Sequence, residues 1–131
     1  MAQWMEYNPN PKSKRVGDCT VRALCAVLDQ DWYETFIGLA LTAITLCDMP
    51  SANSVWGEYL REKGFKRSIV SADCPSCYTV KDFCNKFTKG RYVLALDSHV
   101  ICVIDGCYYD SFDSGEESPI YYWEKEDEND G

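Results

Sequence analysis

The sequence contains one histidine and lacks a long hydrophobic run. His99 is the only imidazole among 131 residues, so any reaction that needs a histidine must use this position. The longest mainly apolar stretch, residues 36–47, is shorter than the ~20 residues that a transmembrane helix requires. The N-terminal residues also lack the basic and then apolar pattern of a secretory signal. We therefore expect no membrane partner and a cytoplasmic location.

Basic residues are scarce. The chain has 13 Lys and Arg against 21 Asp and Glu, which gives a net charge of −8. Binding to a phosphate backbone needs clustered cations, and this balance excludes nucleic acid as the expected partner. One small basic cluster, at Lys12, Lys14, Arg15 and Arg22, is interpreted as a solvated loop.

Cysteine, by contrast, is abundant, with eight residues in the chain. Cys25, Cys47, Cys84 and Cys102 lie within apolar patterns, where a free cysteine packs as a small hydrophobic residue. A chain of this length can bury a core of its own without covalent crosslinks. We therefore expect free thiols and a reducing, cytosolic compartment.

The order of predicted elements indicates an α+β fold, with helices first and an antiparallel sheet after them. The periodicity predicts helices over 19–29, 31–46, 53–63 and 79–87, and strands over 66–70, 91–96, 99–104, 107–112 and 120–123. Residues 1–123 are expected to form one domain. Residues 124–131 are expected to form an acidic, disordered tail.

Local signals fix several of these helix boundaries. Gly17 or Asp18 is expected to cap the first helix, and Asp31 the second. The segment 79–82 has the form of a capping box. The second helix carries an apolar stripe that is expected to face the core. Its members are Tyr33, Phe36, Ile37, Ala40, Leu41 and Ile44.

Cys19 is the candidate nucleophile because it lies at the predicted start of the first helix. The unpaired N–H groups and the positive end of the helix dipole favour the thiolate, which is the reactive form. None of the other seven cysteines has this position as clearly. A nucleophilic thiolate is usually paired with an imidazole, and His99 is the available partner.

A tight turn selects the acid that would orient this histidine. Asp105-Gly106 is the strongest two-residue hairpin signal available. The register that it sets places Asp110 diagonally across from His99 on the same face of the hairpin. Asp113 would point away, and a one-residue bulge would reverse that choice. We therefore predict Asp110 as the third member, with Asp113 second.

The oxyanion formed during acyl transfer needs hydrogen-bond donors. The backbone N–H of Cys19 is the natural first donor. Asn8 and Asn10 are the only side-chain amides in the loop before it, and Asn10 is preferred.

Two segments resemble the papain-like cysteine peptidase superfamily, especially its small bacterial and phage-borne members. They are Gly-Asp-Cys-Thr-Val-Arg-Ala over 17–23 and the histidine–acid hairpin over 99–111. The resemblance implies a helical part carrying the cysteine, packed on an antiparallel sheet carrying histidine and acid. It also implies hydrolysis of a peptide or protein substrate without a cofactor. The family often has glutamine about six residues before the cysteine, where this chain has Ser13.

Three other interpretations remain open. Cys74 and Cys77 have the spacing of half a zinc site, to which Cys84 and His99 could add ligands, or of a redox pair. Alternatively, the fold could serve as a non-enzymatic module that binds a host or partner protein. The acidic tail and the aromatic run 121–123 would support binding. The sequence leaves the oligomeric state open.

Overall fold

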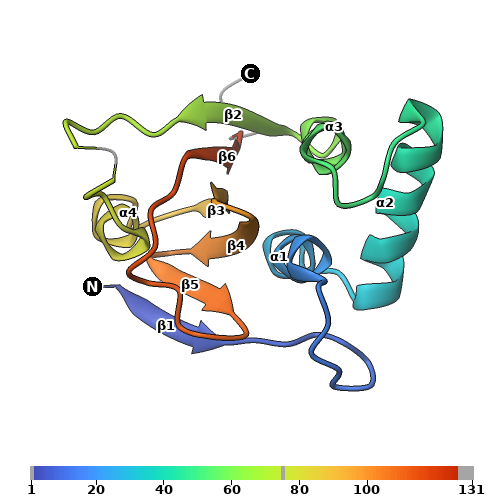
Figure 1. Ribbon diagram of the computed structural model, residues 1–131, viewed down its shortest axis with the longest axis horizontal. Helices are drawn as coiled ribbons and strands as arrows, with labels where there is room; N and C mark the ends of the chain where they lie inside the picture. The colour runs from blue at the N-terminus through green and yellow to red at the C-terminus, as the bar shows by residue number, and fades with distance from the viewer. Residues whose placement is uncertain (1, 75, 127–131) are drawn as a thin grey trace.

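The computed structural model describes residues 2–74 and 76–126, which form four helices and one six-stranded sheet (Figure 1). The predicted α+β class is confirmed. The elements in chain order are β1 (Gln3–Glu6), α1 (Cys19–Leu28), α2 (Trp32–Leu46), α3 (Asn53–Glu62), β2 (Phe65–Ile69), α4 (Val80–Lys86), β3 (Arg91–Leu96), β4 (His99–Ile104), β5 (Cys107–Asp110) and β6 (Tyr121–Lys125).

The sheet is mixed rather than purely antiparallel, and its strand order is β1-β5-β4-β3-β6-β2. The N-terminal strand β1 pairs in parallel with β5, which corrects the prediction of an antiparallel C-terminal sheet. β1 is only four residues long and pairs with residues about a hundred positions away, so no local pattern marks it as a strand. The other four strand pairs are antiparallel.

Helices cover both faces of the sheet. In Figure 1, α1, α2 and α3 lie on one side and α4 lies on the other. Alternate residues of β3 enter the two cores: Val93 and Ala95 join the core under α1 and α3, whereas Tyr92, Leu94 and Leu96 join the core under α4. Burial on both faces explains why β3 and β4 are nearly continuous apolar runs.

Helix α2 shows the largest departure from the predicted burial. Asp31 caps it as expected, accepting a 2.7 Å hydrogen bond from the Glu34 N–H. Five of the six residues of the predicted inward stripe, however, are exposed and Ala40 is half-buried, and the helix buries Thr35, Leu39 and Ala43 instead.

The reason is that α2 is apolar on nearly all sides, so its periodicity did not define a single buried face. The close approach of α3 selects that face. A Cβ added at Gly38 would lie 2.5 Å from the Tyr59 hydroxyl, so only glycine permits this contact.

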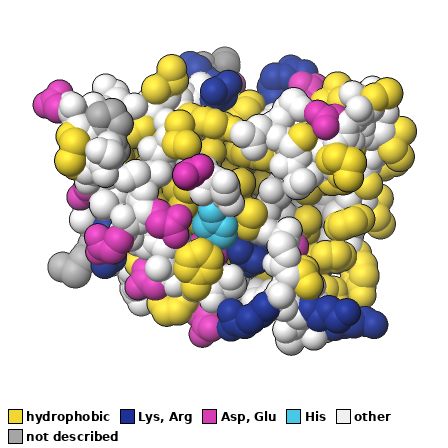
Figure 2. Space-filling view, viewed as in Figure 1, with side chains coloured by type: hydrophobic (Ala, Val, Ile, Leu, Met, Phe, Trp, Pro, Cys, Tyr) yellow, Lys and Arg dark blue, Asp and Glu magenta, His cyan; other side chains and the backbone are white. Residues whose placement is uncertain are grey.

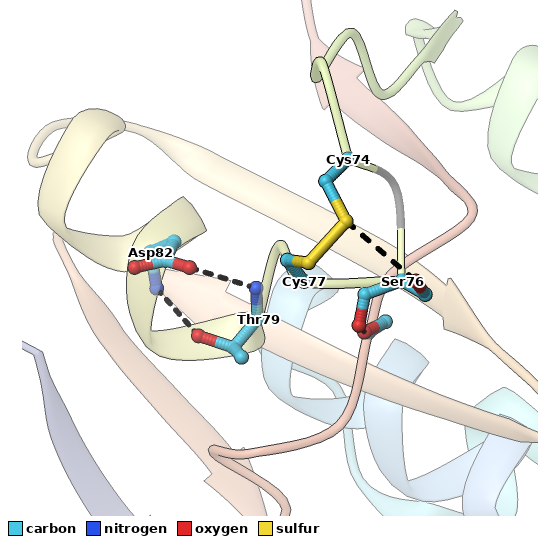
Figure 3. Close-up of a disulfide and its surroundings, with 6 residues drawn as sticks. Cys74, Ser76, Cys77, Thr79 and Asp82 are labelled. Carbon is cyan, nitrogen blue, oxygen red and sulfur yellow. Dashed lines mark hydrogen bonds between the residues drawn. A yellow bond between two sulfur atoms is a disulfide. The ribbon is translucent and has the colours of Figure 1, made fainter.

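The segment before α4 contains a disulfide between Cys74 and Cys77, shown in Figure 3. The expectation that all thiols are free is therefore wrong for this pair. Both residues are exposed, so the packing argument that applies to buried cysteines did not apply to them. The other six cysteines are free thiols.

The predicted capping box follows this disulfide and is confirmed. Thr79 Oγ1 accepts from the Asp82 N–H at 3.2 Å, and Asp82 Oδ2 accepts from the Thr79 N–H at 3.0 Å (Figure 3). At the other end of the chain, β6 includes Glu124 and Lys125, so the predicted tail does not begin at residue 124. The predicted disorder of residues 127–131 lies outside the described residues.

Candidate active site

The predicted catalytic residues lie at the ends of one helix and two strands that meet in the fold. Cys19 is the first residue of α1, His99 is the first residue of β4, and Asp110 is the last residue of β5. Residues of β4 and β5 pair in the register that the Asp105-Gly106 turn predicted.

Of the two candidate carboxylates, the structure places Asp110 and not Asp113 beside His99. His99 Nε2 lies 2.7 Å from Asp110 Oδ2. Asp113 points elsewhere and accepts a hydrogen bond from the Tyr108 hydroxyl.

The imidazole of His99 is held on two sides and remains reachable from solvent. Its side chain is 12% exposed on the face shown in Figure 2, and the Phe112 ring stacks on it with centroids 5.0 Å apart. Burial lowers the pKa of His99, but hydrogen bonds with Asp110 and Cys19 outweigh burial and raise this pKa to about 9. Because Asp110 engages Nε2, Nδ1 is the ring nitrogen left for the thiol.

The Cys19 thiol is biased toward the thiolate. Burial raises the pKa of Cys19, yet hydrogen bonds from His99 and from the Val100 N–H, together with the charge of Arg22, bring it below the usual value of a thiol. A lowered pKa for the cysteine and a raised pKa for the histidine both favour a thiolate–imidazolium pair. The two protons belong to one coupled titration.

Asp110 is fully buried and accepts hydrogen bonds from several directions. Besides His99, its carboxylate accepts from the Ser114 hydroxyl at 2.7 Å and from the Ser111 N–H at 2.7 Å. Burial raises the pKa of Asp110, but the bonds from His99, Ser114 and Ser111 hold it below its usual value. The group is therefore an anion that can orient the imidazole.

Arg22 and Asp18 are the site residues that sequence reasoning missed. Arg22 is only 5% exposed and bridges Asp18 Oδ1 at 2.9 Å and Asp110 Oδ1 at 3.2 Å. Its assignment to a solvated basic cluster was wrong. Asp18 occupies the N-cap position of α1 without a side-chain capping bond; its other oxygen accepts from Trp32 Nε1 at 3.0 Å. The i,i+4 spacing of Asp18 and Arg22 is the sequence signal that could have predicted this ion pair.

Two hollows meet at Cys19 and His99, which line both of them. One has a volume of about 260 Å³ and is also lined by Asn8, Arg15 and Phe112. The other has a volume of about 380 Å³ and lies toward the loop before α3 and the start of β6. A hollow of about 430 Å³ between α3 and β6 has no cysteine or histidine in its lining. Because two hollows meet at Cys19, an extended peptide chain can approach the Cys19 sulfur from either side.

The structure does not bring Asn10 to this site. Its Oδ1 accepts from the N–H groups of Lys12 at 2.9 Å and Lys14 at 3.3 Å, so the side chain stabilises its own loop. Asn8 lines the smaller hollow instead, with Nδ2 donating to the Lys14 carbonyl at 3.2 Å. At the first turn of α1, the N–H of Cys19 has no intrahelical partner.

The cysteines proposed for zinc are not brought together with the histidine. Cys74 and Cys77 form the disulfide, Cys84 is buried in α4, and His99 contacts Asp110. Within residues 2–74 and 76–126, no group of three or more Cys, His, Asp and Glu side chains is arranged to hold a metal ion.

Comparison with family models, curated proteins and solved structures finds no match for this chain. Among the helices that the structure describes, none is long and apolar enough to cross a membrane. The geometry around Cys19, His99 and Asp110 is therefore the basis for assigning a function.

Proposed function

We propose that this protein is a papain-like cysteine hydrolase that cleaves peptide or isopeptide bonds with Cys19, His99 and Asp110. One observation carries the proposal. The imidazole that lies 2.7 Å from the buried Asp110 is also the group that lowers the pKa of Cys19 at the start of a helix. Such an arrangement activates a thiol for attack on a carbonyl.

In the first half-reaction the Cys19 thiolate attacks the substrate carbonyl carbon, and a sulfur–carbon bond forms. The carbonyl oxygen becomes an anion that accepts a hydrogen bond from the Cys19 N–H. The carbon–nitrogen bond then breaks as imidazolium His99 gives its proton to the leaving amine. The products are a free amine, a thioester and a neutral imidazole.

In the second half-reaction water attacks the thioester carbon while neutral His99 accepts a proton from it. The sulfur–carbon bond breaks, the acid product leaves, and the thiolate–imidazolium pair is restored. Asp110 stays ionised throughout and keeps Nε2 occupied, so Nδ1 faces the sulfur in both steps. No cofactor is required by this sequence of bonds.

The remaining assignments are consistent with this function. The two hollows that meet at Cys19 would hold a peptide or protein substrate on either side of the scissile bond. Asn8 replaces Asn10 as the candidate second oxyanion donor, because one amide hydrogen remains after its bond to Lys14. Six free thiols among eight cysteines favour a reducing, cytoplasmic compartment.

Cysteine-selective alkylation tests the proposal. With limiting iodoacetamide near neutral pH, Cys19 should be labelled faster than Cys47 and Cys107. Both are free and not fully buried; Cys47 caps the end of α2 and Cys107 begins β5 after the hairpin turn. The substitution His99→Ala should slow the labelling of Cys19 and leave Cys47 unchanged. Site-resolved mass spectrometry gives each rate. Equal rates at the three cysteines, or a Cys19 rate that His99→Ala does not change, would contradict the mechanism.

A further inference from the structure

Helix α2 presents an uncovered apolar surface on the outside of the molecule. We call its members the outer α2 face: Tyr33, Phe36, Ile37, Leu41 and Ile44 of α2 and Met49 of the loop that follows, which are 42–73% exposed. Figure 1 shows α2 at the margin of the fold, and Figure 2 shows hydrophobic side chains along the same margin. Scattered exposed apolar residues are normal, but a continuous row along one helix indicates an interaction site.

The outer α2 face is large enough for specific binding. The exposed fractions of its six residues add up to the equivalent of about three and a half complete large residues. At roughly 200 Å² each, this is on the order of 700 Å², close to the area of about 800 Å² that one partner contributes to a protein–protein interface of standard size. A helix laid along α2 would cover this area.

A shallow hollow at one end of α2 adjoins the outer α2 face. It has a volume of about 450 Å³ and lies where α2 ends and the following loop begins. Ala40, Ala43, Ile44, Met49 and Pro50 give it apolar walls, and Asp48 is the charged residue in its lining. Buried apolar side chains dominate binding energy at interfaces.

The charged residues in α2 itself and directly flanking it have one sign. Asp31 and Glu34 lie at its N-terminal end and Asp48 at its C-terminal end, while α2 itself contains no lysine or arginine. In the described part of the chain, none of these three carboxylates forms an ion pair. The surface is therefore apolar along its length and acidic at both ends.

We propose that the outer α2 face binds an amphipathic helix of another protein, with lysine or arginine at both ends of the apolar face of that helix. A second copy of this chain fits less well. Antiparallel pairing of two α2 helices would bring Glu34 near Asp48 of the second copy, and parallel pairing would bring like ends together. Either arrangement opposes carboxylates, whereas basic ends complement them.

The proposal does not depend on the hydrolase function. It uses none of Cys19, His99 and Asp110, so the substitution Cys19→Ala should leave binding at the outer α2 face unchanged. Loss of hydrolysis with retained binding, or the reverse, separates the two ideas.

A pair of synthetic peptides tests the proposal. Each is about 15 residues long with leucine along one helical face; one carries lysine in its first and last turns and the other carries glutamate. Titration of the labelled peptides with the full chain is followed by fluorescence anisotropy. The lysine peptide should bind about tenfold or more tightly than the glutamate peptide, and added salt should reduce the difference.

Two substitutions localise the binding. Ile44→Asp places a charge in the outer α2 face and should weaken binding of the lysine peptide by about tenfold or more. Ile69→Asp, at a position 77% exposed on β2, is the matched control and should leave affinity unchanged. Both side chains are exposed, so neither substitution should prevent folding.

Several results would overturn the proposal. These are no binding of the lysine peptide, equal binding of the two peptides, or equal effects of the two substitutions. Self-association in sedimentation velocity that Ile44→Asp abolishes would identify a second copy as the occupant instead. Binding to phosphatidylcholine vesicles that Ile44→Asp abolishes would identify a membrane surface.

Discussion

At the scale of single residues, the candidate site is a chain of charges rather than an isolated triad. Arg22 lies between Asp18 and Asp110, and Asp110 in turn contacts His99. Three of these four side chains are buried, so each depends on its neighbours for compensation of its charge. This arrangement makes Arg22 a positioning residue for the acid that orients the imidazole.

Removal of Arg22 is expected to cost stability. Arg22→Met leaves Asp18 and Asp110 buried without their cation and should lower the free energy of unfolding by about 3 kcal/mol. Urea denaturation measures this change. The control Arg61→Met removes an exposed pair with Glu58 and should change stability by less than about 1 kcal/mol. Similar losses of stability in the two variants would show that the buried Arg22 network contributes no more than an exposed ion pair.

The pH dependence of the site follows from the two pKa shifts. Alkylation of Cys19 should rise at a pH below the ordinary thiol value of about 8.5, because the pKa of Cys19 is lowered. Peptide hydrolysis should also fall as pH rises through about 9, because His99 then loses the proton that the leaving amine needs.

Two substitutions test the alkaline limb of the pH–rate profile, where hydrolysis falls. Asp110→Asn removes a bond that raises the pKa of His99, so the alkaline limb should move to lower pH. Asp113→Asn should leave both limbs in place, because Asp113 bonds to Tyr108 rather than His99. Rates of hydrolysis and alkylation across the pH range provide the measurement. An unchanged alkaline limb in Asp110→Asn would argue against the assigned role.

At the scale of secondary-structure elements, the β4–β5 hairpin places the acid. Its turn uses positive φ at both positions, 49° at Asp105 and 80° at Gly106. A tight turn with these angles fixes the register of the strands and therefore the face on which Asp110 lies. Asp110 could be predicted from sequence because this relation is local.

A substitution at Gly106 tests whether this turn requires glycine. Gly106→Ala combines positive φ with a Cβ 3.3 Å from the Cys84 carbonyl and should lower the free energy of unfolding by about 1–2 kcal/mol. Gly17→Ala, where no atom lies within 4 Å of an added Cβ, should change it by less than about 0.5 kcal/mol. Thermal or urea unfolding distinguishes them. A neutral Gly106→Ala would mean that the turn tolerates a side chain.

At the scale of the whole molecule, the N-terminal strand supports the acid from a distance. Trp4 Nε1 donates to the Asp110 carbonyl at 3.2 Å, and the Tyr7 N–H donates to the same carbonyl at 2.9 Å. Trp4 also packs against the core under α4. The strand therefore holds β5 in place from the edge of the sheet.

We expect Trp4→Ala to affect both stability and reactivity. It removes the packing and the bond to Asp110, so the free energy of unfolding should fall by about 2 kcal/mol and alkylation of Cys19 should slow. Gln3→Ala, at an exposed position on the same strand, should change neither. Parallel denaturation and alkylation of the two variants provide the comparison. Equal stability and equal alkylation rates in the two variants would show that β1 does not support the site.

The sequence by itself determined the helices, most of the strands, the capping box and the approach of His99 to Asp110. These features depend on residues close together in the chain, through helix periodicity, capping and one tight turn. Tertiary structure alone decided the parallel pairing of β1, the outward face of α2 and the burial of Arg22 between two acids. Each of these depends on which distant elements pack together. The residues next to an all-round apolar helix or a single arginine in the sequence do not determine which side is buried or which partner is contacted.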